Sequence, residues 1–214
     1  MTPTLTLYGA PYSVYVRIVR LVLLEKNVDY RLETVDIFKP DKAVEAYRSI
    51  HPFAKIPAIN VDGFVLYETG AIVRYLDEIF PEPALMPDTA RERANVNRIL
   101  SIIDNYAYPS MVWGIYVALR EQGESACESD AFNKHCERAE TVFCVLDTAL
   151  EGKAPYLGGH RLSLADLHAV PVLDYFLQTT TGQKMVAHHP NVQNWWERIK
   201  TQHRFDGILS EGAD

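Results

Sequence analysis

The sequence predicts two domains: a small α/β domain over residues 1–80 and an all-helical domain over residues 89–214. In the first part of the chain, short alternating stretches are interleaved with segments of helical periodicity. The segment FPEPALMPD (residues 80–88) then places three prolines in nine residues, which is typical of a linker, here 81–88. After this linker the strand-like alternation is absent, so the rest of the chain is expected to be helical.

The elements of the first domain follow one another as strand, helix, strand, helix, hairpin and helix. TLTLY (4–8) alternates as a strand does, and SVYVRIVRLVLLEKN (13–27) has helical spacing that Asn27 is suited to end. DYRLETVDI (29–37) predicts a second strand, parallel to the first in a βαβ unit. DKAVEAYRSI (41–50) is a short helix, PAINVDGFVLYE (57–68) a hairpin turning at Asp62-Gly63, and TGAIVRYLDEIF (69–80) a closing helix.

The second domain is predicted from helical patterns alone. Residues 89–120 form one long helical pattern, with a bend expected at Pro109. The next helix has one apolar face, made of Phe132, Cys136, Ala139, Phe143, Leu146 and Leu150. Two further helices lie in RLSLADLHAVPVLDYFL (161–177) and HPNVQNWWERIKT (189–201). Ser163 and Asp166 are spaced as a capping box, a structural feature that fixes a helix start.

Composition excludes several classes of protein. The formal charge of −7 and the lack of Lys/Arg runs argue against nucleic-acid binding. No apolar run approaches the roughly 20 residues of a membrane span, and the first residues do not resemble a signal peptide. Three cysteines without CxxC spacing indicate free thiols, a cytoplasmic location and no metal site.

Several motifs, in a fixed order, resemble the cytosolic glutathione transferases. They are YGAPYSVYVRIVR (8–20), PFAKIP (52–57), YET (67–69), LSLADL (162–167) and HPNVQNWWERI (189–199). Together they cover nearly the whole chain. The resemblance implies a thioredoxin-like first domain that binds glutathione, a helical second domain that contributes the pocket for an electrophile, and a homodimer.

The resemblance also implies which residues bind glutathione. The Ile56-Pro57 bond is expected to be cis, which lets the main chain of Ile56 pair with the cysteinyl part of glutathione. Thr69 is expected to cap the closing helix, whose N-terminus favours the γ-glutamyl carboxylate, and Glu68 to face the glutamyl ammonium. Lys55 and Lys42 match positions that contact the glycyl carboxylate in relatives, although an exposed lysine is commonly only solvated.

Two hydroxyls compete for the role of activating the glutathione thiol. Ser13, at the predicted start of the first helix, matches the catalytic serine of the serine-type classes (phi, theta and zeta) without a gap. Tyr8 ends the first strand, as the catalytic tyrosine of other classes does, but that alignment needs a one-residue insertion. We therefore assign Ser13 as the catalytic residue and keep Tyr8 as the alternative. Arg17, four residues after Ser13, either adds positive potential there or is a solvated surface charge.

Aromatic and apolar residues offer surface for an apolar second substrate. The candidates that we select from them are Tyr12, Phe38, Tyr106 and Met111. A cysteine at position 13 would indicate disulfide exchange, and a Ser-Ser-Cys run would indicate the isomerases of the zeta class; neither is present. A non-catalytic scaffold, or a glutathione-dependent isomerase, peroxidase or dehalogenase, remains the alternative to a transferase.

Overall fold

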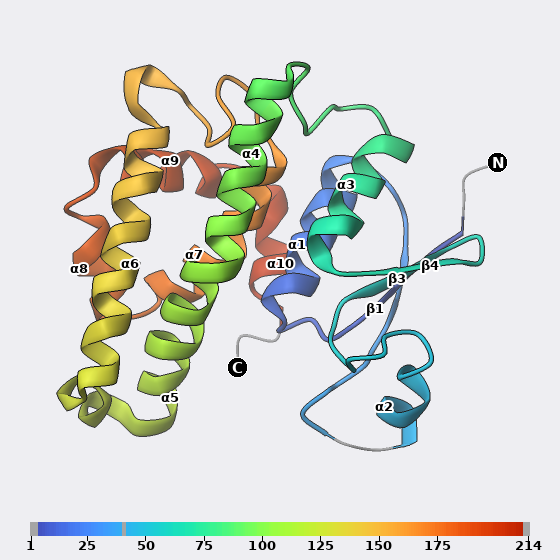
Figure 1. Cartoon of the computed structure of the whole chain (residues 1–214), viewed down its shortest axis with the longest axis horizontal. Coiled ribbons are helices and arrows are strands. Elements are labelled where there is room, and N and C mark those ends of the chain that lie inside the picture. The colour runs from blue at the N-terminus through green and yellow to red at the C-terminus, as the bar shows by residue number, and fades with distance from the viewer. Residues whose placement is uncertain (1–3, 40–41, 212–214) are drawn as a thin grey trace. The chain divides into compact units, whose positions relative to one another are not determined.

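The computed structural model describes residues 4–39 and 42–211, and these form two units. The first unit contains the described residues up to Ala84 and those from Arg204 onward; the second is Leu85–His203 (Figure 1). No helix in the described part of the chain combines the length and apolarity needed to cross a bilayer.

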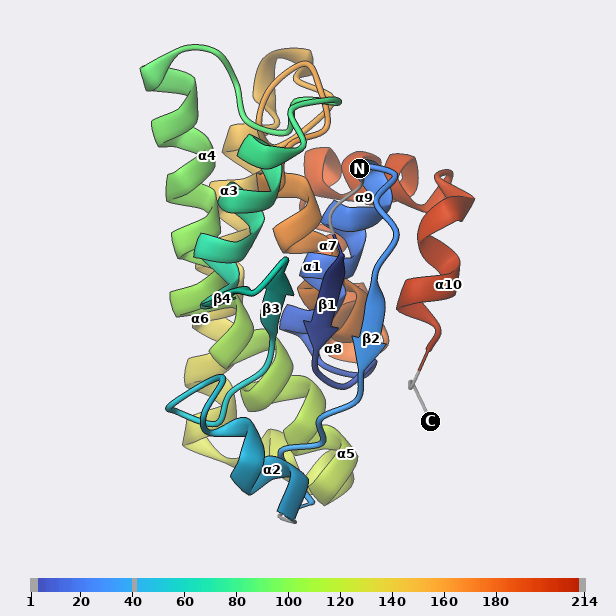
Figure 2. The same ribbon diagram turned by 90° about the vertical axis from the view of Figure 1, so that its right-hand side faces the viewer.

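A four-stranded sheet forms the centre of the first unit, with strand order β2-β1-β3-β4 (Figure 2). The strands are β1 (Leu5–Tyr8), β2 (Arg31–Glu33), β3 (Ala58–Val61) and β4 (Phe64–Tyr67). β1 and β2 are parallel and the other pairs antiparallel, as the predicted βαβ unit and hairpin require. Asp62 and Gly63 both have positive φ, 49° and 92°, which the two-residue turn of this hairpin needs.

Three helices complete the α/β part of this unit. They are α1 (Val14–Glu25), α2 (Lys42–Tyr47) and α3 (Thr69–Ile79). α1 packs beside α3, and fully buried Ile18, Leu21, Ile72 and Leu76 join Leu7 and Ile59 of the sheet in the core. The sequence-predicted order of strands and helices in this domain is therefore confirmed.

The end of the chain groups with the first unit, whereas the sequence assigned all of residues 89–214 to the helical domain. Here η4 (His203–Phe205) leads into α10 (Asp206–Leu209), which packs on α1. Arg204 contacts the buried Glu25 carboxylate at 2.8 Å, and Arg17 donates to the carbonyl of Glu211 at 2.8 Å. The segment is held by these polar contacts and by the buried side chains of Phe205 and Ile208. An apolar pattern does not reveal the polar contacts.

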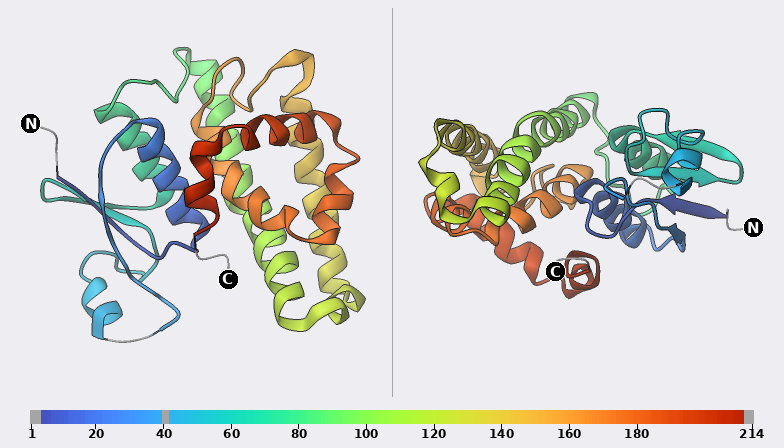
Figure 3. Two further views of the ribbon diagram at one scale, coloured as in Figure 1. Left: turned by 180° about the vertical axis from the view of Figure 1, so that it is seen from behind. Right: turned by 90° about the horizontal axis from the view of Figure 1, so that it is seen from below.

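The second unit is entirely helical, as predicted (Figure 3). Its elements are α4 (Ala90–Ile102), η1 (Ile103–Val117), α5 (Ala118–Gln122), η2 (Gly123–Glu128), α6 (Asp130–Ala149), η3 (Glu151–Lys153), α7 (Leu164–Leu177), α8 (Thr180–Val186) and α9 (Pro190–Lys200). α4, η1 and α5 follow one another as a single rod, and α6 packs along it (Figure 1). η1 is a π-helical segment with Pro109 inside it, where a residue without an N–H cannot continue the regular α-helical bonding.

A buried carboxylate organises the core of the helical unit. Asp166, in the first turn of α7, accepts four hydrogen bonds: from the N–H of Leu157 (2.8 Å), the N–H and hydroxyl of Ser163 (2.9 and 2.7 Å), and Nε1 of Trp195 (2.8 Å). Burial raises the pKa of Asp166, and the four donors oppose that shift. The contact between Asp166 and Ser163 that the sequence predicted is present, and the same carboxylate also anchors α9.

Candidate active site

Ser13 caps the N-terminus of α1. β1 ends at Tyr8, a short turn follows, and the N–H of Ser13 donates to the carbonyl of Ala10 at 3.0 Å. The Ser13 hydroxyl oxygen accepts from the N–H of Val16 at 3.5 Å, a long bond that leaves the hydroxyl proton available. The side chain is half-buried, and no acidic residue lies in the first turn of α1. The hydroxyl therefore stands at the positive end of a 12-residue helix.

Arg17 supports the turn before Ser13. Its side chain is fully buried, so it is not the solvated surface charge that the sequence allowed. Its Nε donates to the carbonyl of Pro11 at 3.1 Å, and its Nη2 donates to the carbonyl of Glu211. The guanidinium thus joins the turn to the end of the chain and places a positive charge one helical turn after Ser13.

The register of the sheet brings three segments of the predicted glutathione site to the same edge of the sheet, where β1 and β4 end and β3 begins. Tyr8 of β1 pairs with Ala58 of β3, which pairs in turn with Tyr67 of β4. These three residues form one row across the sheet. The turn that leads to Ser13 follows the first, the Ile56-Pro57 bond precedes the second, and Glu68 follows the third. Segments far apart in sequence therefore lie together.

The Ile56-Pro57 peptide bond is cis, as expected. Ile56 and Pro57 are both buried and lead directly into β3. Gly9 lies against Ile56, because a Cβ atom at Gly9 would stand 3.5 Å from Cβ of Ile56. The main chain of Ile56 is thus next to the turn that carries Ser13.

The start of α3 differs by one residue from the prediction. The N-cap is Glu68, and Thr69 is the first helical residue. The Glu68 carbonyl accepts from the N–H groups of Ala71 and Ile72, both at 2.9 Å. Glu68 is exposed, and its backbone has φ 71° and ψ 111°, a conformation that residues other than glycine rarely adopt. The chain reverses at Glu68, so the capping position shifts to it, and such backbone outliers cluster at functional sites.

Of the two lysines predicted to contact glutathione, Lys55 lies on the segment before the cis bond and Lys42 begins α2. Lys55 is exposed, and its carbonyl accepts from the hydroxyl of buried Tyr47 at 2.8 Å. Burial raises the pKa of Tyr47, so this hydroxyl stays a donor. Lys42 begins α2, but its side chain lies outside the described residues.

The four second-substrate candidates fall into two pairs. In the first unit, the rings of Tyr12 and Phe38 lie 6.1 Å apart, and the Phe38 side chain is 61% exposed. The Tyr12 hydroxyl donates to Asp36 at 2.6 Å and thereby holds the pKa of that carboxyl below its ordinary value. In the helical unit, Tyr106 is 51% exposed. Met111 is fully buried and presents no surface to a substrate, so the structure removes it from the set.

Comparison with known proteins decides the family. The glutathione S-transferase N-terminal domain model matches residues 7–84, and the glutathione S-transferase C-terminal domain model matches residues 105–203. The chain belongs to the glutathione S-transferase family. This confirms the resemblance and the fold that the sequence implied.

Similar glutathione S-transferases come from plants. The chain is 32% identical to glutathione S-transferase 3 of Zea mays over 96% of this chain and 93% of the maize protein. It is 29% identical to glutathione S-transferase F13 of Arabidopsis thaliana over 93% and 92% of the two chains. The crystal structure of glutathione transferase F7 from Populus trichocarpa superposes with a TM-score of 0.79 at 27% identity, covering 97% and 98%. By this homology to phi-class-like relatives, the protein is a glutathione S-transferase enzyme.

Sequence reasoning assigned no role to one residue of the site. His51 is only 2% exposed, and its ring lies 4.6 Å from that of Tyr67, the residue before Glu68. Burial lowers the pKa of His51, and the charge of Glu68 opposes this shift. The His51 Nδ1 atom has no hydrogen-bond partner in the described part of the chain. The signal in the sequence was its position in HPFAKIP, five residues before Ile56.

Proposed function

We propose that this glutathione S-transferase binds glutathione along the Tyr8–Ala58–Tyr67 edge and that the Ser13 hydroxyl stabilises its thiolate. The observation that carries the proposal is the row itself, which brings the N-termini of α1 and α3 and the main chain of Ile56 to one edge. A helix N-terminus and a hydroxyl donor both favour an anion. An edge with two such termini suits a ligand that carries a thiolate and a separate carboxylate.

Each part of glutathione has a complementary group in this proposal. Its cysteinyl segment pairs with the main chain of Ile56 beside Pro57. Its γ-glutamyl carboxylate lies at the first turn of α3, near Thr69, and its ammonium faces Glu68. Lys55 contacts the glycyl carboxylate. Lys42 stays in the same role as a prediction from the sequence.

The energy that this assignment asks of Ser13 is modest. A cysteine thiol has an unperturbed pKa of about 8.5, so only a few per cent is thiolate at neutral pH. Lowering this pKa by one to two units takes about 1.4–2.7 kcal/mol. A charge-assisted hydrogen bond of about 1.5–3 kcal/mol, added to a helix end, supplies that amount. The thiolate then attacks the electrophilic atom of the second substrate and displaces its leaving group.

The second substrate is an apolar electrophile in this account. Tyr12 and Phe38 support this, because they form an adjacent aromatic pair on the first unit and Phe38 is largely exposed. Aromatic surface of this kind favours apolar, planar ligands. The role of Tyr106 stays a prediction from the sequence.

We also propose a homodimer located in the cytoplasm. The exposed large apolar side chains of the first unit include Phe53 (69%), Phe64 (50%) and Val65 (39%). A second copy of the chain would cover apolar side chains of this kind. The three cysteines are unpaired, in keeping with a reducing compartment. Light scattering of the wild type and of Phe53→Ser with Phe64→Ser tests the dimer: the wild type should be dimeric and the double variant largely monomeric. A monomeric wild type would contradict it.

The experiment for the proposed function compares wild type, Ser13→Ala and Tyr8→Phe in the conjugation of glutathione to a chlorodinitrobenzene-type electrophile. Ser13→Ala should lower kcat/KM at neutral pH by about tenfold to a hundredfold, in line with one to two pKa units, while Tyr8→Phe stays near wild type. The reverse result would transfer the role to Tyr8. A wild type that neither binds a glutathione matrix nor conjugates would support the scaffold alternative instead.

A further inference from the structure

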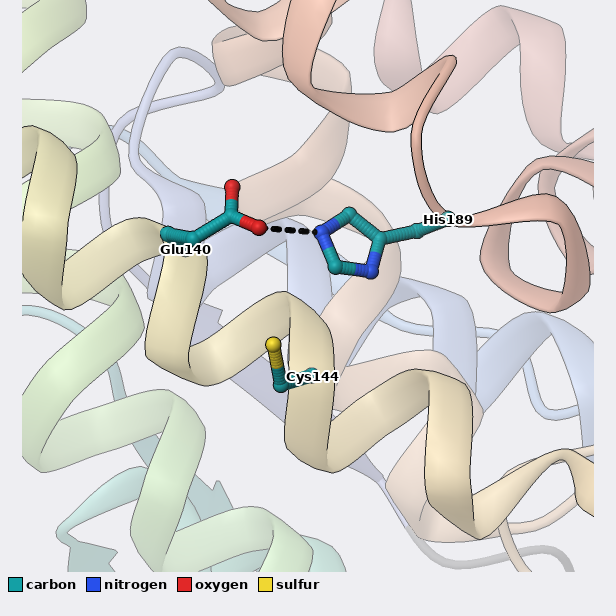
Figure 4. A group of neighbouring side chains, drawn as sticks. All are labelled: Glu140, Cys144 and His189. Carbon is teal, nitrogen blue, oxygen red and sulfur yellow. Dashed lines mark hydrogen bonds and ion pairs between the residues drawn. The ribbon is translucent and has the colours of Figure 1, made fainter.

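Three side chains with metal-binding atoms converge in the helical unit, within Leu85–His203. Glu140 and Cys144 lie four residues apart on α6 and so leave the helix on the same side. His189 caps the N-terminus of α9 and points at them (Figure 4). Nε2 of His189 is 2.9 Å from Oε1 of Glu140, and one donor atom from each residue lies within 4.8 Å of the other two.

The histidine is held in place by its neighbours. Its side chain is 9% exposed, and its ring packs on that of Phe143, with centroids 5.3 Å apart. One turn beyond Cys144, the Asp147 carboxylate accepts from the N–H groups of Asn191 (3.0 Å) and Val192 (3.2 Å). These hydrogen bonds fix the start of α9 on α6. The three metal-binding side chains therefore extend from two helices whose relative position is fixed by hydrogen bonds.

The donor set indicates the kind of ion. A thiolate, an imidazole and a carboxylate together suit zinc and similar transition ions, whereas magnesium and calcium require mostly oxygen ligands. In a tetrahedral zinc site, ligand atoms stand about 3.3–3.8 Å apart, given bond lengths of about 2.0–2.3 Å. Glu140 and Cys144 are exposed, so their side chains have room to rotate, and a shift of their donor atoms by about 1 Å brings the three atoms to these separations.

We propose that Glu140, Cys144 and His189 bind one divalent transition ion of the zinc type. Three protein ligands leave one coordination position for water. The bound ion joins α6 to α9 and stabilises the helical unit, because it binds the folded chain and not the separated ligands. The sequence predicted no metal site, since His189 is 45 residues from Cys144 and only the packing of α9 on α6 brings them together. This proposal does not depend on the transferase assignment.

Cobalt(II) is the probe for this site, because a cobalt–thiolate bond gives a charge-transfer absorption in the near ultraviolet. The tag-free full-length protein is freed of metal by chelation and kept reduced with a phosphine, without glutathione, whose thiol would itself bind the ion. The wild type should develop the absorption with saturation at one equivalent, and zinc should remove it. Absence of a saturable absorption would overturn the proposal.

Matched variants locate the ligands. Cys144→Ser should abolish the absorption, whereas Cys127→Ser and Cys136→Ser should keep it. Glu140→Gln, at an exposed position where misfolding is not expected, should weaken cobalt affinity by about tenfold or more. Persistence of the absorption in Cys144→Ser would contradict the assignment.

Thermal unfolding gives a second readout. Zinc should raise the Tm of the wild type and leave that of Cys144→Ser unchanged. An equal shift in both proteins would show that the ion binds elsewhere. A Glu140–His189 ion pair without metal binding predicts no zinc-dependent shift in either protein, and that outcome also overturns the proposal.

Discussion

Replacing Asp166 with asparagine tests how much of the helical unit depends on its buried carboxylate. Oδ1 accepts from Leu157 and Trp195, and Oδ2 accepts from the N–H and the hydroxyl of Ser163. Asparagine keeps the shape of the side chain but replaces one oxygen with an NH2 group. If the NH2 group takes the place of Oδ1, the N–H groups of Leu157 and Trp195 both face a donor. If it takes the place of Oδ2, the Ser163 hydroxyl can turn and accept from it, and only the N–H of Ser163 faces a donor. At least one N–H therefore loses its acceptor.

The expected cost follows from the loss of this acceptor. Hydrogen bonds to a charged group contribute about 1.5–3 kcal/mol each, so Asp166→Asn, which loses at least one of them, should lower the free energy of unfolding by about 1.5–3 kcal/mol or more. Because the substitution is isosteric, no cavity contributes to this loss. The net free energy of unfolding of a protein is only about 5–15 kcal/mol, so this loss should weaken the helical unit measurably.

Urea unfolding followed by tryptophan fluorescence measures this loss. Trp113, Trp195 and Trp196 all belong to the helical unit, so the signal reports that unit. Asp130→Asn is the control, because Asp130 also lies in the first turn of a helix but is exposed, and it should cost less than about 0.5 kcal/mol. A loss below about 1 kcal/mol for Asp166→Asn would refute the role assigned to the four bonds.

Three further changes probe the first unit. Gly9→Ala should destabilise it by about 2–4 kcal/mol in urea unfolding followed by circular dichroism, because the added Cβ would stand 2.3 Å from Cγ2 of Val16; a neutral effect would contradict the close contact. Tyr12→Phe should raise the pKa of Asp36 in an NMR titration, and an unchanged pKa would show that the 2.6 Å bond does not set it. His51 has a lowered pKa in the folded state, so on acidification the unfolded chain takes up its proton first. Stability should therefore fall as pH drops below about 6.5, less so in His51→Asn, and equal losses in urea midpoint between about pH 7.5 and 5.5 would contradict this.

The first unit was the more predictable part of the fold, because each element has a local signal. Alternation in residues 4–8, helical spacing after Ser13 and the Asp62-Gly63 turn are properties of neighbouring residues, and the structure contains all three elements. The start of α3 was predicted one residue late. Thr69 is a favourable capping type, but the chain reverses at Glu68, and that depends on the register of β4 against β3.

Burial and long-range contacts were harder to predict. Met111 shares its helix with exposed aromatics, and its orientation follows from the packing of η1 against α6 and α7 rather than from residue type. His51 is unremarkable in sequence and becomes notable only when its ring packs on Tyr67. The attachment of residues 204–211 to the first unit combines the buried Phe205 and Ile208 with polar contacts such as Arg204 with Glu25, and no periodic pattern predicts the latter.

Titration of the glutathione thiol in complex with the protein tests the central claim most directly. Thiolate absorbance is measured against pH for glutathione bound to wild type, Ser13→Ala and Tyr8→Phe. The account predicts a thiol pKa one to two units below about 8.5 in wild type and Tyr8→Phe, and a return to within about half a unit of the free value in Ser13→Ala. A Ser13→Ala complex that titrates like the wild type would contradict the assignment of Ser13.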